Sequence, residues 1–182
     1  MTCMPACDDA SLLLEPATTA DRRRVMRVRA PAGMAHYVHY NWFWLDRSLR
    51  DPAIRFRLAR LLPRRALVGV VAYGPFEPVD QDPASRIAQI GEIYHLVVDR
   101  ARAGQGLGRR IARRALAALR VELPAITAVR VGHHPANAAS ARLFAALGFT
   151  PIGEKVDHET GMRDVLRELD LGPPGHPSRS IP

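Results

Sequence analysis

The chain has 182 residues and a mass of 20.1 kDa, and 47% of its residues are hydrophobic. This length predicts one domain with a sizeable buried core. No run of about 18 apolar residues is present, which excludes a membrane-spanning helix and gives no reason to expect a membrane partner. The N-terminus lacks the basic and apolar segments of a secretory signal, so we expect a cytoplasmic protein.

The charge is strongly basic. The chain carries 26 Lys+Arg against 18 Asp+Glu, a net charge of +8, which invites a nucleic-acid-binding interpretation. However, Lys155 is the single lysine, and the arginines are scattered from Arg22 to Arg179. This usage is more typical of a codon bias than of a phosphate-binding face, and we expect no nucleic-acid partner.

The cysteines and histidines are poorly spaced for a metal site. Cys3 and Cys7 lie in an expected tail without further cysteines as partners, so we expect two incidental reduced thiols. No carboxylate or cysteine is spaced to complete a zinc site with either histidine pair, His36 with His39 or His133 with His134. We therefore predict no metal.

In the first half of the chain, helical and alternating patterns follow a tail over residues 1–9. They predict, in order, a strand at 11–15, helices at 19–29 and 34–49, and strands at 55–61 and 66–73. A loop rich in prolines follows at 74–85.

The second half alternates strands and helices more regularly. The predicted elements are a strand at 87–98, a helix at 107–121, a strand at 127–131, a helix at 137–147, and strands at 150–156 and 163–171. The tail over 172–182 is rich in proline and glycine and should add no core. Together these elements predict one mixed α/β domain over residues 10–171.

Three glycines at alternate positions, Gly104, Gly106 and Gly108, join the strand 87–98 to the helix after it. Glycine tolerates a positive φ and lets the backbone approach a ligand closely. The helix N-terminus offers unpaired N–H groups, which suit a phosphate or pyrophosphate. Further positive charge around this end comes from Arg109, Arg110, Arg113 and Arg114.

Two other glycine-loop folds do not fit. A P-loop ends in Gly-Lys-Ser/Thr, whereas Gly108 is followed by two arginines. A dinucleotide-binding fold needs G-x-G-x-x-G and a later acidic residue, whereas the spacing here is G-x-G-x-G and residues 124–128 contain no acid. Taken alone, the loop is then either a phosphate site or a turn that merely begins a helix.

A second motif, about thirty residues downstream over residues 137–149, changes this balance. With it, the sequence resembles the GNAT superfamily of N-acetyltransferases over nearly the whole domain. That family has L-x-V in a strand, a glycine loop opening a helix, then Asn-x-x-Ala/Ser, an aromatic residue and Gly-Phe. The residues that match are Leu96, Val98, Gly106, Gly108, Asn137, Ser140, Gly148 and Phe149. The resemblance implies an α/β (α+β) fold, with one mostly antiparallel sheet flanked by helices and splayed between two strands to admit acetyl-CoA.

The resemblance also implies where acetyl-CoA binds. The strand residues Leu96, Val97 and Val98 would hold the pantetheine arm, and Asn137 would contact it from the next helix, although a helix cap explains Asn137 equally well. The pyrophosphate would be held by backbone N–H groups of Gly104, Gln105, Gly106, Leu107, Gly108 and Arg109, and Ala103 and Phe144 would also contact the cofactor. The family prefers Arg or Gln where this chain has Ala103, and Arg102 stands one residue earlier. We therefore expect weaker or shifted cofactor binding.

Acetyl transfer to an amine needs a proton acceptor. Glu92 stands where some family members have a glutamate base, and strand alternation predicts that it shares a face with Tyr94, Leu96 and Val98. A solvated or arginine-paired glutamate is the alternative. The family's usual general acid, a tyrosine next to the cofactor, is replaced by Phe144. Another group must then donate the proton, with Tyr94, Tyr73 and His133 as candidates, or the thiolate leaves unassisted.

The acceptor is less defined. Five aromatic residues crowd positions 37–44, on the segment that forms one acceptor wall in the family, and a cationic or apolar amine would suit such a wall. Tyr37 or Trp42 is expected to face the substrate, and Tyr94 and His133 are further candidates. The sequence thus predicts acetylation of a primary amine on a small molecule or a protein N-terminus. A non-catalytic acyl-CoA-binding module is the alternative, and a homodimer through the C-terminal strands is left open.

Overall fold

The structure is a computed structural model that describes residues 11–38, 40–78, 82–156, 161 and 163–173. Cys3, Cys7, His39 and most of both predicted tails lie outside these residues. Within the described part of the chain, no helix is both long and apolar enough to cross a membrane.

Seven strands of the described chain form one mixed sheet in the order β1–β2–β3–β4–β5–β7–β6. All neighbouring strands are antiparallel except β4 and β5, which run parallel. The strands are β1 Leu12–Pro16, β2 Arg55–Leu61, β3 Ala66–Phe76, β4 Ile87–Val98, β5 Ala128–His133, β6 Thr150–Val156 and β7 Arg163–Asp170. The predicted fold class is therefore confirmed.

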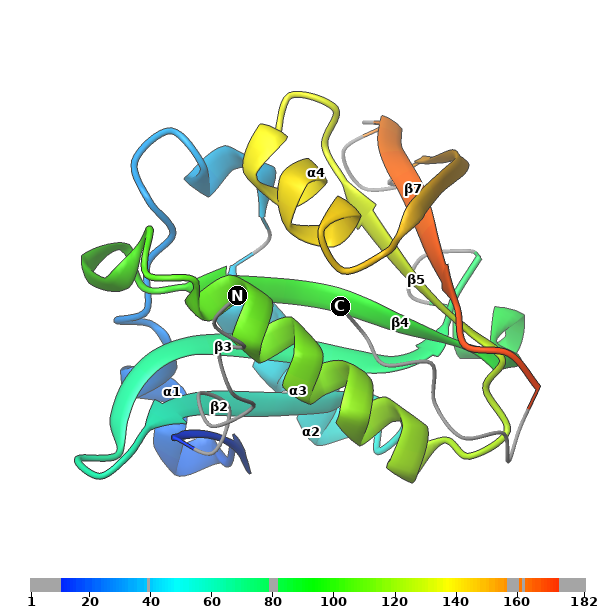
Figure 1. The fold of residues 1–182 in the computed structure, drawn as a ribbon. Helices are drawn as coiled ribbons and strands as arrows, with labels where there is room; N and C mark the ends of the chain where they lie inside the picture. Colours follow the sequence, from blue (N-terminus) through cyan, green and yellow to red (C-terminus); the bar gives the residue numbers. More distant parts are fainter. Residues whose placement is uncertain (1–10, 39, 79–81, 157–160, 162, 174–182) are drawn as a thin grey trace, which may run out of the picture.

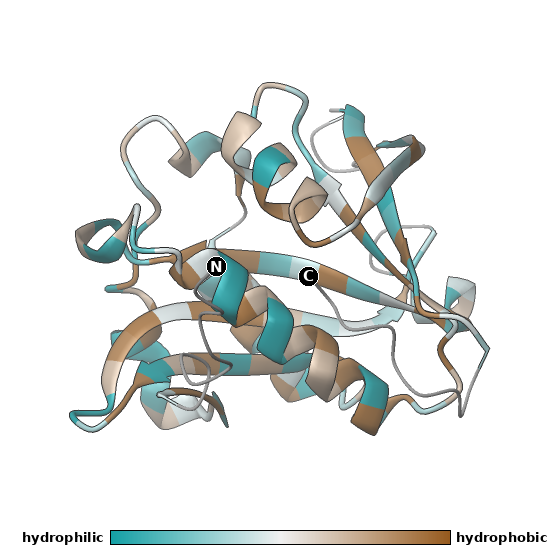
Figure 2. Ribbon diagram, viewed as in Figure 1, coloured by the Kyte–Doolittle hydropathy of each residue, from teal (hydrophilic) through white to brown (hydrophobic). Residues whose placement is uncertain are grey.

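Helices cover both faces of this sheet (Figure 1). On one face, α3 (Leu107–Glu122) and α4 (Ala138–Ala145) pack over a core with fully buried Ile111 and Leu119. On the other face, the short α1 (Arg22–Val25) and α2 (Asn41–Arg50) cover a second core around Leu45. The buried residues of α3 form a hydrophobic stripe that packs on the sheet, as its apolar spacing predicts. Along its ribbon, hydrophilic residues alternate with hydrophobic ones (Figure 2).

β4 and β5 pair only briefly before they part. Their parallel register covers Ile90 to Glu92 on β4 and Ala128 to Arg130 on β5. From Ile93 onward the two strands diverge (Figure 1), so one backbone edge of β4 is not covered by β5. We call this opening the wedge.

The two predicted helices at 19–29 and 34–49 are wrong in extent. The first is a 3-10 turn followed by α1, which ends at Val25, and the second is a 3-10 turn over Ala35–Tyr37 and then α2. Asn41 explains part of the break, because its side-chain N–H₂ donates to the carbonyls of Val25 and Val28 at 3.1 and 2.7 Å. These bonds fix a non-helical segment that lies over the end of β4.

The predicted loop at 74–85 begins too early. β3 continues to Phe76 because Gly74 and Pro75 pair with Glu92 and Gly91 on β4. Pairing with a long neighbouring strand outweighs the local turn preference of Gly-Pro. The ranges of β2, β4 and β6 agree with their predictions.

A β-bulge at Tyr94 interrupts the alternation of β4. His95 lies opposite Ala72 of β3, but the next β3 residue, Tyr73, lies opposite Ile93. Tyr94 is therefore the extra residue of the bulge, and such a residue reverses the side-chain alternation beyond it.

The predicted common face of Glu92, Tyr94, Leu96 and Val98 is consequently wrong. Leu96 and Val98 pack with the core under α3, whereas Tyr94 packs with the core under α2. A Cβ on Gly91 would meet residues of the α3 side, so its neighbour Glu92 points to the opposite face, toward α2. The bulge thus separates Glu92 and Tyr94 from Leu96 and Val98, which lie on the other face.

Candidate active site

A groove of about 330 Å³ runs along the uncovered edge of β4 to the start of α3. Its lining includes the β4 residues Leu96, Val97 and Val98; Arg102, Ala103, Gly104, Gly106, Leu107, Gly108 and Arg109 around the loop; and Asn137, Ser140 and Leu143 around α4. Of the predicted cofactor residues, only Gln105 and Phe144 are not in this lining. The structure therefore gathers sequence-distant motifs around one groove.

The glycine loop has the backbone that its sequence predicts. Gly104 and Gly106 have φ values of +76° and +71°, which side chains rarely tolerate. Gly106 is the N-cap of α3, so the first N–H groups of this helix are directed toward the loop without carbonyls of the helix to receive them. Gly108 is different: a Cβ there would lie 3.7 Å from Leu143 and from Val98 and would narrow the groove.

The four arginines predicted to surround this end do not act together. Arg109 lines the groove, as does Arg102 from the preceding turn. Arg110 instead donates from Nη2 to Ser11 Oγ at 2.6 Å, which ties α3 to the start of β1. Arg113 and Arg114 are not among the lining residues. Ala103 replaces the arginine or glutamine that the family prefers, but Arg102 still places a guanidinium at the groove.

Asn137 serves as a helix cap and also borders the groove. Its Oδ1 accepts a hydrogen bond from the Ser140 N–H at 3.0 Å, and its side chain is buried. The cap interpretation is therefore confirmed. The residue also borders the wedge, so contact with a ligand is compatible with the cap.

A smaller cavity of about 100 Å³ fills the wedge itself. Phe144 lines it and packs edge-to-face on Phe149, with ring centroids 5.3 Å apart. Tyr37 lines it from the other side and stacks on His134 at 4.7 Å. The α1–α2 segment and the turn after β5 thus meet across the mouth of the wedge.

The candidate proton donors lie in different places. Tyr73 is in the core beside α3, where its hydroxyl donates to Glu122 Oε1 at 3.0 Å and burial raises its pKa to about 12. Tyr94 and His133 both line the wedge. Tyr73 therefore lies away from the wedge, and the sequence alone could not distinguish it from Tyr94 and His133 as a candidate donor.

The polar groups of Tyr94 and His133 are already engaged. The Tyr94 hydroxyl donates to the Pro75 carbonyl, and burial, followed by the charges of Glu92 and Glu77, raises its pKa above the ordinary value. His133 Nε2 accepts from Arg167 Nε at 2.9 Å, so Nδ1 carries the hydrogen donated to the His134 carbonyl at 3.0 Å. Both side chains are held in place rather than poised to donate into the wedge.

Glu92 is buried at the point where β4 and β5 part. Its side chain is 4% exposed, and it is the last β4 residue paired with β5. Lys155 Nζ of β6 donates to Oε1 at 3.2 Å, and the backbone N–H of Glu77 donates to Oε2 at 3.2 Å. Glu92 is therefore ion-paired, as the alternative prediction from the sequence stated, but its partner is a lysine and not an arginine.

A second ionic group lies directly behind it. Glu77 is buried and accepts from Arg47 Nη2 at 2.6 Å and from Arg86 Nε and Nη2, both at 2.9 Å. Arg86 also binds Asp51, and this hydrogen bond is the main reason that the pKa of Asp51 lies below its usual value. We refer to Glu92, Lys155, Glu77, Arg47, Arg86 and Asp51 as the polar cluster.

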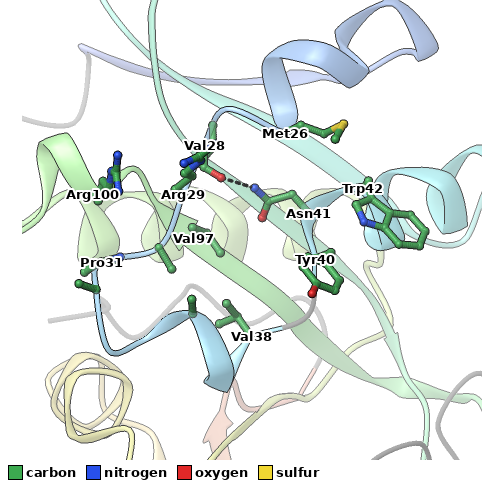
Figure 3. A pocket seen from close by; sticks show the side chains of 13 residues that line it. Met26, Val28, Arg29, Pro31, Val38, Tyr40, Asn41, Trp42, Val97 and Arg100 are labelled. Carbon is green, nitrogen blue, oxygen red and sulfur yellow. Dashed lines mark hydrogen bonds between the residues drawn. The ribbon is translucent and has the colours of Figure 1, made fainter.

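The aromatic residues at 37–44 divide between two roles. Trp44 is buried and stacks on Tyr94 at 5.0 Å. Trp42 is 39% exposed and, together with Tyr40, borders a pocket of about 490 Å³ on the α1–α2 side (Figure 3). Tyr37 and Trp42, the two predicted substrate contacts, therefore line different cavities.

Asn41 links this pocket to β4. Its N–H₂ donates to the carbonyls of Val25 and Val28, and Figure 3 shows the bond to Val28. Its Oδ1 must therefore accept, and His95 donates to it from Nε2 at 2.8 Å. The α1–α2 segment is thereby attached to the bulged part of β4.

Sequence reasoning missed Asn41, Glu77 and Lys155. The first two carried no visible signal. Lys155 did carry one, because it is the only lysine in a chain that otherwise uses arginine. In the described part of the chain, no three His, Cys, Asp or Glu side chains gather closely enough to hold a metal ion.

Comparison with known proteins adds independent findings. The model of the Acetyltransferase (GNAT) family matches residues 21–149. No curated protein matches the sequence.

Solved structures share the fold at low sequence identity. An aminoglycoside acetyltransferase in complex with coenzyme A aligns with TM-score 0.67 and 16% identity, covering 88% of this chain and 95% of its own. A spermidine N-acetyltransferase from Vibrio cholerae has TM-score 0.65 and 14% identity, with 88% and 94% covered. A ribosomal-protein-S5-alanine acetyltransferase from Vibrio fischeri has TM-score 0.65 and 14% identity, with 94% and 96% covered. The match over residues 21–149 covers more than half of the 182 residues and agrees with the splayed sheet, so the chain belongs to the acetyltransferase (GNAT) family.

Proposed function

We propose that the protein is an acetyl-CoA-dependent N-acetyltransferase that moves an acetyl group to a primary amine by direct attack in a ternary complex. One observation carries this proposal: the groove along β4 leads into the wedge, and the wedge opens beside the buried carboxylate of Glu92. Three acetyltransferases with this fold are named for aminoglycosides, for spermidine and for an alanine of a ribosomal protein, which are all amine acceptors.

The groove fits the proposed cosubstrate. Acetyl-CoA supplies an activated acetyl thioester on a long arm that ends in phosphates. The uncovered edge of β4 at Leu96 to Val98 would hydrogen-bond the amide-containing arm as a neighbouring strand does. The positive φ of Gly104 and Gly106 turns the loop so that the N–H groups at the start of α3 would receive the pyrophosphate. Arg102 and Arg109 add positive charge there.

Glu92 is proposed as the proton acceptor. Because it points toward the α2 face, an amine that approaches from this face would have a carboxylate on its own side of the sheet. Glu92 does not itself line the wedge, so we propose that water carries the ammonium proton to it. The neutral amine then attacks the thioester carbon, and the thiolate leaves.

The departing thiolate receives no proton from position 144. Phe144 lies in the wedge, where its ring packs but cannot donate. Tyr94 and His133 both use their polar atoms within the protein. We propose that the coenzyme A thiolate, a tolerable leaving group, departs without a side-chain acid.

Glu92→Gln tests the proposed base. The variant keeps the size of the side chain but removes its basicity, so kcat should fall about 10²–10⁴-fold near neutral pH. It should recover partly at alkaline pH, where free amine accumulates. Calorimetry should give an acetyl-CoA affinity close to wild type. Wild-type turnover across this pH range would instead make Glu92 a structural carboxylate.

A non-catalytic acyl-CoA-binding module is the second candidate, favoured by the absence of a donor at Phe144. It predicts acetyl-CoA binding without amide formation. A screen of amines and peptides that follows free thiol and acetylated product separates the two candidates. Thiol release without acetylated product would indicate hydrolysis only.

A further inference from the structure

Lys155 is the residue of β6 that turns inward. β6 is an edge strand, and every other residue in it is exposed. The Lys155 side chain is only 14% exposed and places Nζ 3.2 Å from Glu92 Oε1. Nζ also lies 5.5 Å from the centre of the Phe76 ring. A flexible side chain on an open edge is therefore directed across the sheet to one buried carboxylate.

The identity of this cation stands out in the sequence. The chain has 26 Lys+Arg, and Lys155 is the single lysine among them. Lysine carries a compact ammonium, whereas arginine carries a wide planar fork. The Phe76 ring is already covered by Arg130, whose guanidinium carbon lies 4.5 Å from the ring centre. The Lys155 ammonium and the Arg130 guanidinium therefore both lie near the Phe76 ring.

Glu92 needs a positive charge because burial penalises its ionised form. Three other described cations nearby are engaged with different carboxylates. Arg130 on β5 is paired with Glu168 at 2.8 Å, and Arg47 and Arg86 bind Glu77. Of the described titratable groups on the packed elements, Glu77 and Tyr94 interact electrostatically with each other and Tyr94 with Glu92, and Asp164 lies opposite Lys155 on β7.

We propose that Lys155 is a positioning residue that keeps Glu92 ionised and oriented at the closed end of the wedge, where β4 and β5 part. This inference rests on the proposed role of Glu92 as the base. Lys155 does not touch the reacting atoms; its charge determines the pH range in which the base is available. An opposite charge at this distance lowers a carboxyl pKa by about 1 to 3.

The decisive variant is Lys155→Met, which removes the charge and keeps an unbranched side chain. The acid limb of its kcat–pH profile should move up by about 1 to 3 pH, with wild-type rates approached at alkaline pH. At the pH where the wild type is half-maximal, kcat should fall at least about fivefold. Lys155→Arg should return the limb toward its wild-type position, because it restores the positive charge.

Arg163→Met is the matched control. It removes a cation from the same β6–β7 hairpin, but this cation is 72% exposed and paired with Glu154. Its pH profile should coincide with that of the wild type. Circular dichroism and acetyl-CoA affinity establish that each variant is folded and loads its cosubstrate.

A second measurement does not depend on turnover. Because Lys155 is the only lysine, protein labelled with ¹³C at lysine Cε gives a single lysine signal in NMR. Its titration reports the pair directly, and Glu92→Gln should lower the pKa of Lys155, since an opposite charge is lost. An unchanged titration would show that the two groups are not coupled and would overturn the proposal.

The two proposals fail in different ways. If Glu92→Gln keeps the acid limb of the wild-type kcat–pH profile, Glu92 is not the base, and the proposed role of Lys155 is then wrong as well. If Glu92→Gln abolishes the limb while Lys155→Met leaves it in place, Glu92 remains the base and the Lys155 inference alone is wrong. If Lys155→Arg behaves like Lys155→Met, charge is not what Lys155 contributes, and the inference is again overturned.

Discussion

The groove and the polar cluster lie at different points along the same strand, β4, and differ in the groups that form them. The groove is mainly backbone: the uncovered edge of β4, two glycines with positive φ and the start of a helix. The polar cluster is made of side chains from α2, the end of β3, β4, β6 and the loop segments beside them. A backbone site needs few particular side chains, whereas a side-chain site depends on every partner.

This difference predicts how each region responds to substitution. Changes in the glycine loop of the groove should reduce cosubstrate affinity and leave the fold intact, because Gly104 and Gly106 have no neighbouring atoms at the position of a Cβ. Changes in the polar cluster should reduce stability as well as turnover, because a buried charge without its partner is costly.

The largest expected effect is on the polar cluster. Glu77→Ala leaves Arg47, whose side chain is 11% exposed, without the carboxylate that binds it. The free energy of unfolding should fall by about 3–5 kcal/mol, the usual cost of breaking a buried pair on one side. Urea denaturation followed by circular dichroism measures this change.

Two controls sharpen the result. Glu154→Ala breaks an exposed pair with Arg163 and should cost no more than about 1 kcal/mol. The double variant Arg47→Met/Glu77→Leu should regain part of the lost stability, because it removes both charges of the buried pair and leaves Arg47 no longer present as an unpaired cation. Equal losses for the buried and the exposed pair would remove the distinction between the two regions.

Gly108→Glu tests the groove. Its side chain would enter the space between Leu143 and Val98 and place a negative charge beside the expected pyrophosphate. Acetyl-CoA affinity should fall at least about 100-fold, or about 2.7 kcal/mol, because like charges oppose each other at close range. Calorimetry gives the affinity, and the melting temperature should change little. Ala117→Glu, on the exposed side of the same helix, is the charge-matched control.

Asp51 gives a pH test of the polar cluster. The hydrogen bond from Arg86 holds the pKa of Asp51 below its unfolded value of 3.8. The stabilisation it provides is therefore present above pH 3.8 and is lost as the pH falls through the lower folded pKa. Asp51→Asn should cost about 1.5 kcal/mol or more at pH 7 and much less near pH 2. Urea unfolding at both pH values tests this, with the more exposed Asp46→Asn as a comparison. A pH-independent loss would assign the effect to packing.

The smallest expected effect is that of Phe144→Tyr. It adds one hydroxyl in the wedge without removing a contact of the ring. If the thiolate leaves unassisted, this hydroxyl should raise kcat by less than the roughly 100-fold that a well-positioned general acid typically contributes. Stopped-flow detection of free thiol measures the rate. A folded variant with unchanged kcat would indicate that thiolate departure does not limit turnover.

Local sequence determined much of the fold and of the groove. The range of β2 follows from hydrophobic alternation, and the glycine loop follows from backbone conformations that other residues rarely adopt. The wedge was predicted only from the family resemblance, because no particular residue pattern marks the point where two strands part. Such features can be predicted because they depend on contiguous residues or on the spacing of a family motif.

The tertiary structure decided what lies around Glu92. The bulge at Tyr94 arises from the register between β3 and β4, and it separates Glu92 from Leu96 and Val98, whose face it was expected to share. Lys155 reaches Glu92 from a strand 63 residues away in the sequence. Neither effect follows from neighbouring residues, because register and ion pairing are set by whichever distant groups the folded sheet brings together. The sequence by itself therefore determined the backbone site, and only the packed sheet determined which charges surround the proposed base.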